Sequence, residues 1–142
     1  QGIESLQLSD TGPELYVDIG LKEMIPMTQL GQGFNRLLDI YSRLVLEETK
    51  VLLVDEIENG LYWKSMPLIW RGLFAAAREW DVQIFATTHS AECIRAADEA
   101  AREGPGFDLA LIRLDRVEGE IKATTLGEEG LRAAKEFGWE LR

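Results

Sequence analysis

The stretch VLLVDE, residues 51–56, places four apolar residues directly before two acids. An apolar run without alternation predicts a short parallel strand that is covered on both faces. Asp55 and Glu56 then lie at the carboxyl end of that strand, where open α/β sheets bind their ligands. In a nucleotide hydrolase, the first such acid would hold Mg²⁺ and the second would polarise the attacking water. A solvated acidic turn is the alternative, because this pattern also occurs by chance.

A second strand and the only histidine of the chain follow about thirty residues later. Residues 82–87 predict a buried strand, joined to the first by a helix over residues 64–80. A connection of this length is expected to be right-handed and to leave the two strands adjacent and parallel. His89 would then stand at the same edge as Asp55, where its ring can reach a phosphate or position a water. A structural role is the alternative for a lone histidine.

A glycine segment precedes the most regular helical pattern of the chain. Apolar side chains between residues 34 and 45 recur at the spacing of an amphipathic helix. Two glycines before it would expose backbone N–H groups and direct a helix dipole toward an anion. An ordinary glycine-containing turn is the alternative. The segment consists of Leu30, Gly31, Gln32, Gly33 and Phe34.

The remaining patterns complete one domain over residues 1–142. The first thirty residues predict a hairpin, with strands at 3–8 and 15–19. Ser90 is the expected N-cap of a helix that ends near residue 103. Two more strands and a short helix follow, at 109–114, 121–126 and 128–137. The fold class expected from this order is α/β with parallel core strands and flanking helices.

Composition limits the partners. The formal net charge is -10 at pH 7, which argues against a broad nucleic-acid surface, because binding to phosphates relies largely on Lys and Arg. One cysteine cannot form an intramolecular disulfide, and no apolar run reaches membrane-spanning length. We therefore expect a cytoplasmic setting, with no membrane partner.

The order of these motifs resembles the C-terminal half of ABC-type ATPase heads. It is similar in particular to bacterial AAA-family, ABC-like ATPases related to the overcoming-lysogenization-defect proteins, whose typical runs match LGQGFNRLL, VLLVDEIENGLYW and QIFATTHSAE. The resemblance implies a P-loop fold that dimerises head to tail around two ATP molecules with Mg²⁺. It makes Asp55 the Walker B metal acid, Glu56 the catalytic base and His89 the switch histidine. The signature loop falls on Leu30, Gly31, Gln32, Gly33 and Phe34. Arg36, just past that loop, is a further candidate for contact with nucleotide or the partner head.

Three departures from the family pattern stand out. Gly31 replaces the signature serine, and Tyr62 stands where a histidine is usual. The Walker A loop, which requires a Gly-Lys pair, is absent, because the lysines at 22, 50, 64, 122 and 135 follow Leu, Thr, Trp, Ile and Ala. We expect the phosphate-gripping half in an N-terminal segment outside this chain, and no ATP turnover by the chain alone.

The sequence therefore favours part of an ATP-hydrolysing head that drives a partner module such as a nuclease. A metal-dependent nuclease or phosphatase is one alternative, with Asp55, Glu56, Glu58 and His89 as ligands. A non-catalytic interaction domain that keeps the fold is the other, and it is favoured by Gly31 and Tyr62.

Overall fold

The computed structural model of the chain describes residues 4–10, 12–45 and 49–136. The first residue of the first expected strand and the last residue of the final expected helix lie outside these ranges. So do the closing residues 138–142, on which part of the family resemblance rests.

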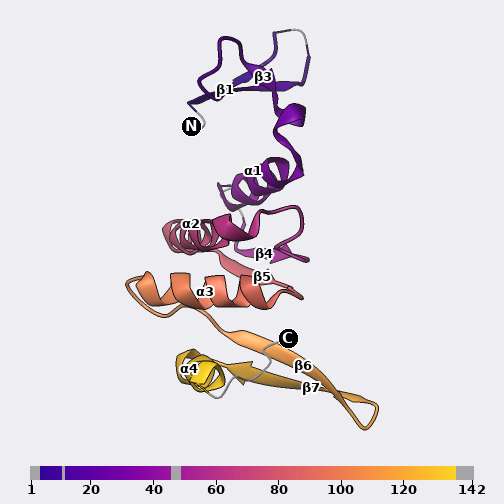
Figure 1. Cartoon of the computed structure of the whole chain (residues 1–142), viewed down its shortest axis with the longest axis vertical. Coiled ribbons are helices and arrows are strands. Elements are labelled where there is room, and N and C mark those ends of the chain that lie inside the picture. The colour runs from indigo at the N-terminus through magenta and orange to yellow at the C-terminus, as the bar shows by residue number, and fades with distance from the viewer. Residues whose placement is uncertain (1–3, 11, 46–48, 137–142) are drawn as a thin grey trace.

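A two-stranded parallel sheet occupies the centre of the molecule. Strand β4 (Val51–Val54) pairs in parallel with β5 (Gln83–Ala86), as the sequence predicts. Helix α1 (Gln32–Val45) lies before β4, α2 (Met66–Glu79) connects the two strands, and α3 (Ala91–Glu103) follows β5. Figure 1 shows these helices stacked beside the sheet along the long axis of the molecule. The α/β class expected from the sequence is confirmed.

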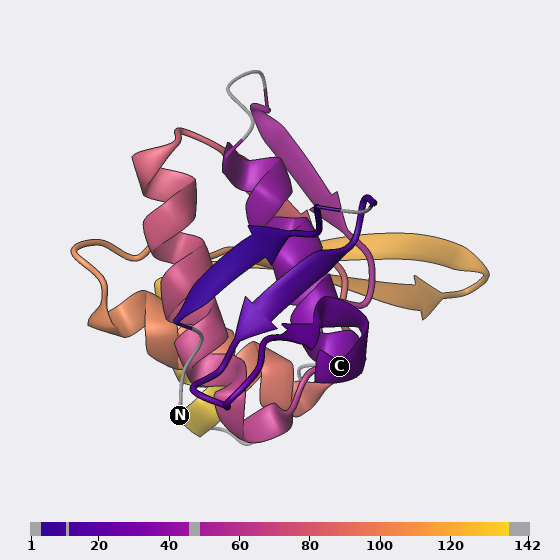
Figure 2. The ribbon, with the colours of Figure 1, turned by 90° about the horizontal axis from the view of Figure 1, so that it is seen from above.

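An antiparallel sheet lies at the N-terminal end. Strand β1 (Ser5–Leu8) pairs with β2 (Leu15–Asp18), and β2 pairs with β3 (Ile25–Pro26). The hairpin follows the prediction, whereas β3 is too short to produce a periodic pattern. A 3₁₀ turn, η1 (Met27–Leu30), then leads into α1. In Figure 2, seen from above, this sheet lies in front of α1.

A second hairpin and a short helix form the opposite end. Strands β6 (Leu111–Val117) and β7 (Glu120–Leu126) are antiparallel, and α4 (Glu128–Glu136) follows them. Glu118 and Gly119 both have positive φ, 54° and 88°, as a two-residue hairpin turn of this type requires. The turn lies where the sequence places it, but β6 begins two residues later and ends three residues later than predicted.

The main hydrophobic core lies between the helices and one face of the central sheet. A 3₁₀ turn, η2 (Trp63–Ser65), starts α2 with Pro67 in its first turn, a position where proline lacks only a hydrogen bond that the helix does not need. Alanines on α3 let it approach α2 closely. No helix in the described part of the chain is long and apolar enough to cross a membrane. The core includes Ile40, Leu44, Leu52, Val54, Ile57, Met66, Ile69, Trp70, Leu73, Phe74, Cys93, Ala97 and Ala101.

The expectation that β4 is covered on both faces is wrong for this chain. Leu52 and Val54 are buried, whereas Val51 and Leu53 are 54% and 74% exposed. The prediction of a buried second strand is wrong in the same way, because Phe85, the register partner of Leu53 on β5, is also exposed. The helices cover only the face that carries Leu52 and Val54, because those two strand residues belong to the core cluster that α1, α2 and α3 complete. The other face is left apolar and open in the described residues.

Two leucines on α2 test this arrangement. Leu73 is 1% exposed and Leu68 is 70% exposed. We expect Leu73→Ala to lower the free energy of unfolding by about 2–5 kcal/mol, because it leaves a cavity in the core. Leu68→Ala makes the same change on the same helix and should stay within about 0.5 kcal/mol of the starting protein. Urea denaturation measures both, and equal effects would contradict the placement of α2.

Candidate functional site

The carboxyl ends of β4 and β5 lie side by side and extend their pairing into the loops. Val54 and Ala86 are register partners. Beyond them, the Thr87 N–H donates to the Val54 carbonyl at 2.9 Å, and the Ile57 N–H donates to the Thr87 carbonyl at 3.0 Å. The acids after β4 and the polar residues after β5 are therefore held at one edge, as the sequence predicts.

Thr87 connects the two acids at this edge. Its hydroxyl donates to Asp55 Oδ1 at 2.5 Å and accepts from the Glu56 N–H at 2.8 Å. One side chain thus fixes both the Asp55 carboxylate and the backbone of Glu56. Sequence reasoning missed Thr87, although a hydroxyl residue directly after β5 is the natural neighbour of the residue directly after β4.

Glu56 has an unusual backbone conformation. Its φ is 45°, in the left-handed region, which costs a residue other than glycine about 1–3 kcal/mol and concentrates at functional sites. The Glu56 carbonyl accepts from the Asn59 N–H at 2.9 Å, and its carboxylate accepts from Asn59 Nδ2 at 3.4 Å. Because the Glu56 side chain remains exposed, the strained turn presents a carboxylate to the edge of the sheet.

Glu58 ties the same loop to the histidine. Its Oε1 accepts the His89 N–H at 2.9 Å, so the backbone of His89 is held beside the acidic turn. Partial burial raises the pKa of Glu58. Hydrogen bonds from its own backbone N–H, the His89 N–H and the Thr88 hydroxyl together lower it by more, so the pKa lies below its ordinary value. Glu58 is therefore ionised at neutral pH and holds the histidine loop by charge-assisted hydrogen bonding.

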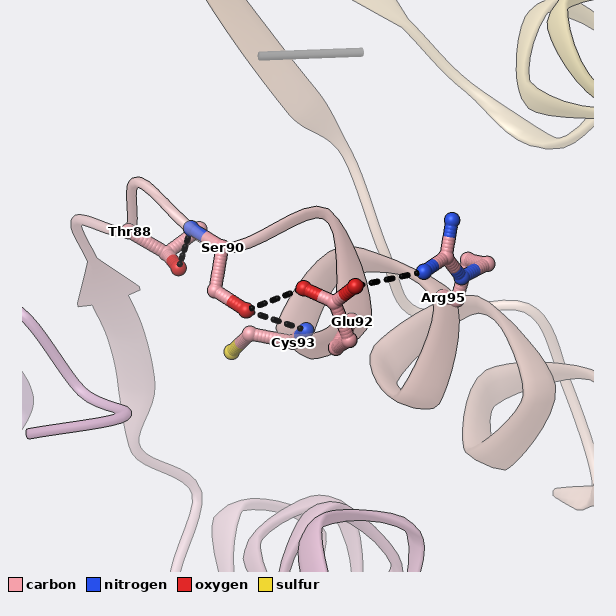
Figure 3. A network of polar contacts seen from close by, with 5 residues as sticks. All are labelled: Thr88, Ser90, Glu92, Cys93 and Arg95. Carbon is pink, nitrogen blue, oxygen red and sulfur yellow. Dashed lines mark hydrogen bonds and ion pairs between the residues drawn. The ribbon is translucent and has the colours of Figure 1, made fainter. Parts of the chain in front are cut away.

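A capping network fixes the start of α3 directly after His89 (Figure 3). The Ser90 hydroxyl accepts from the Cys93 N–H at 3.1 Å and donates to Glu92 at 3.1 Å, and Glu92 pairs with Arg95 at 2.9 Å. The Thr88 hydroxyl accepts the Ser90 N–H at 3.0 Å. The predicted N-cap is confirmed, and it limits how far the backbone of residues 88–90 can move.

The glycine segment packs on the loop that follows the acids. A methyl group added at Gly33 would overlap the carbonyl oxygen of Gly60, whose φ is +76°. Gly33 is thus required for a close approach of two backbones within the chain. Gly31 has a φ of +86°, which disfavours the serine expected there from the family pattern. Residues 30–34 also line a small hollow together with Tyr62, whose side chain is exposed.

The edge suits magnesium bound together with phosphates. Mg²⁺ is usually held by one or two carboxylates plus substrate oxygens rather than by an all-protein cage. Asp55 is exposed, and Thr87 fixes its carboxylate through one oxygen. Within residues 4–10, 12–45 and 49–136, no three His, Cys, Asp or Glu side chains are grouped as metal ligands, so the nuclease alternative has no multi-ligand site in that part of the chain.

The family of the chain follows from comparison with known proteins. The family model described as "AAA domain, putative AbiEii toxin, Type IV TA system" matches residues 13–95. The chain belongs to this family. The match runs from the first hairpin through the glycine segment, both acids and the histidine into α3.

Two similar proteins place this AAA domain further. It is 33% identical over 86 residues to a Helicobacter pylori protein named ATP/GTP phosphatase, a match that covers 58% of this chain and 23% of that protein. The chain thus spans about a quarter of this curated relative's length. A solved structure from work on ATP-driven dimerization and DNA-stimulated activation of SMC ATPases superposes with a TM-score of 0.63 at 15% identity, and covers 95% of this chain and 80% of that one. The AAA domain has part of a P-loop ATPase fold.

Gly33 allows a test of how the glycine segment of the AAA domain is held. We expect Gly33→Ala to lower the free energy of unfolding by about 1–3 kcal/mol, because the added methyl group forces α1 away from the Gly60 carbonyl. The neighbouring substitution Gln32→Ala, at an exposed position, should change it by less than about 0.5 kcal/mol. Thermal unfolding of both variants provides the comparison. An unchanged Gly33→Ala protein would show that the two backbones do not meet.

Proposed function

We propose that this AAA domain is the C-terminal part of an ABC-type ATPase head that binds and hydrolyses ATP. The bridge that Thr87 makes between Asp55 and Glu56 carries the proposal. It fixes the Asp55 carboxylate and the backbone of Glu56 at the carboxyl edge of parallel strands, which is the ligand-binding edge of such sheets. The Asp55 carboxylate is hydrogen-bonded to a hydroxyl and is suited to hold a metal ion. The Glu56 carboxylate stands on a strained turn and is suited to orient a water molecule.

The three residues at this edge take separate roles. Asp55 would hold Mg²⁺ directly or through water, and Mg²⁺ would supply neutralisation of charge on the β- and γ-phosphate oxygens. Glu56 would orient the attacking water and accept its proton. His89, whose backbone Glu58 fixes, would place its exposed ring near the γ-phosphate. These are the roles that the family resemblance assigns to the same positions.

The phosphate-gripping half of the head fits the open side of the central sheet. In the described residues, β4 and β5 pair only with each other, so each strand has a free edge. A groove of about 1740 Å³ is lined by both β5 and β6 and by the exposed Leu53 and Phe85. Small-molecule pockets measure about 300–1,000 Å³, so this groove suits a polypeptide segment. We propose that the half with the Walker A loop fills it.

The glycine segment would serve the second head of a dimer. Residues 30–34 stand at the N-terminus of a helix of 14 residues, where backbone N–H groups and the helix dipole favour an anion. In the proposed head-to-tail homodimer, they face the γ-phosphate held by the partner. The motifs suggest ATPases related to the overcoming-lysogenization-defect proteins, in which such a head would drive a nuclease or another effector module.

The substitution Glu56→Gln tests the proposal in the intact protein that contains the Walker A half. The amide keeps the shape of the side chain but cannot accept the proton, so ATP should stay bound while hydrolysis slows by about 10²-fold or more. Glu118→Gln is a matched control, because Glu118 is also exposed and left-handed, with a φ of 54°. Nucleotide binding by filtration and phosphate release should be measured for both variants.

Two results would contradict this assignment. Full turnover by the Glu56→Gln protein would remove Glu56 from the reaction. Loss of ATP binding in that variant would mean that Glu56 holds the nucleotide rather than the water.

A further inference from the structure

We infer that Arg36 is a positioning residue that links the glycine segment to the conformation of Glu56. The inference deepens the proposed function and rests on it, because it concerns how the proposed base is held. Arg36 lies on α1, one turn after Gly33. Its guanidinium is directed to the acidic turn of its own chain.

The contacts of Arg36 are with backbone atoms at the turn. Its Nη2 donates to the carbonyl of Asp55 and, at 3.1 Å, to the carbonyl of Glu56. These two carbonyls belong to the two peptide groups that flank the Glu56 Cα atom. Arg36 therefore acts on the orientation of the peptide units that define the left-handed conformation.

The backbone of Glu56 is held from two sides. Thr87, at the end of β5, binds its N–H, and Arg36, on α1, binds its carbonyl. Because the φ of 45° is unfavourable for a glutamate, the turn persists only while such contacts hold it. Removal of the Arg36 contacts should let the turn relax toward ordinary dihedral angles and move the carboxylate away from its working position.

The geometry also lets Arg36 couple the glycine segment to the acidic turn. Gly33 and Arg36 are three residues apart on α1, and Gly33 packs on Gly60 while Arg36 holds the turn at Glu56. Any shift of α1 that accompanies anion binding at residues 30–34 therefore changes both contacts with the acidic loop. The Arg36 Nε is buried and has no hydrogen-bond partner among the described residues, so its alignment depends on the position of the helix.

The test uses the intact protein with three substitutions. Arg36→Met removes the donors and keeps an unbranched apolar stem. Arg36→Lys keeps the charge but offers a point donor in place of the planar fork. Arg43→Met is the matched control, since Arg43 lies on the same helix, is exposed and pairs with Asp39. We expect Arg36→Met to lower kcat at least about tenfold with KM for ATP within about twofold, Arg36→Lys to restore part of kcat, and the control to match the starting protein.

Hydrogen exchange provides a readout that does not depend on turnover. Amides of residues 56–60 should exchange faster in Arg36→Met and intermediate in Arg36→Lys, at a temperature where both variants are folded. If Arg36→Met retains the kcat of the starting protein, the inference is wrong. A retained kcat with a raised KM for ATP would mean that Arg36 contacts the nucleotide directly. If the starting protein has no turnover that depends on Glu56, the proposed function fails instead, and unchanged exchange in Arg36→Met would separately overturn the positioning role.

Discussion

The parallel pairing of β4 and β5, carried past the strand ends by Thr87, is the constraint on which the rest of the site depends. The backbone of Thr87 bonds to Val54 and Ile57, and its hydroxyl bonds to Asp55 and Glu56. One residue thus fixes the exit of the acidic loop from the sheet, the Asp55 carboxylate and the backbone of Glu56. Helix α2 supports this pairing, because its buried face packs in the same core as both strands.

The helices complete only one side of this centre. Leu52 and Val54 belong to the helix-covered core, whereas Leu53 and Phe85 form an apolar face that remains open in the described residues. An open apolar face is unusual on a soluble monomer and marks a surface that another segment covers. This open face is consistent with the proposal that the phosphate-gripping half of the head covers it.

Short-range sequence patterns correctly predicted the elements whose formation depends on neighbouring residues. The unbroken apolar run at 51–54, the helical spacing on α1 and the N-cap at Ser90 each follow from neighbouring residues. The edge position of Asp55 follows from strand order. The hydroxyl bridge of Thr87 and the left-handed turn at Glu56 could not be predicted in this way. They depend on the register between two strands that lie far apart in the sequence. The same apolar run wrongly predicted that both faces of β4 are covered. A run of four apolar residues shows that both faces of a strand can be buried, but it does not show which segments of the chain pack on them.

The central claim is that ATP is bound and cleaved at the edge formed by Asp55, Glu56 and Thr87. A structure of the intact Glu56→Gln protein with Mg-ATP tests it most directly. The proposal predicts Mg²⁺ at about 2.1 Å from an Asp55 oxygen or from a water that Asp55 holds, with residue 56 facing the γ-phosphate and residues 30–34 of a second copy across from it. A nucleotide bound away from Asp55, or an edge at Thr87 that faces only solvent, would contradict it.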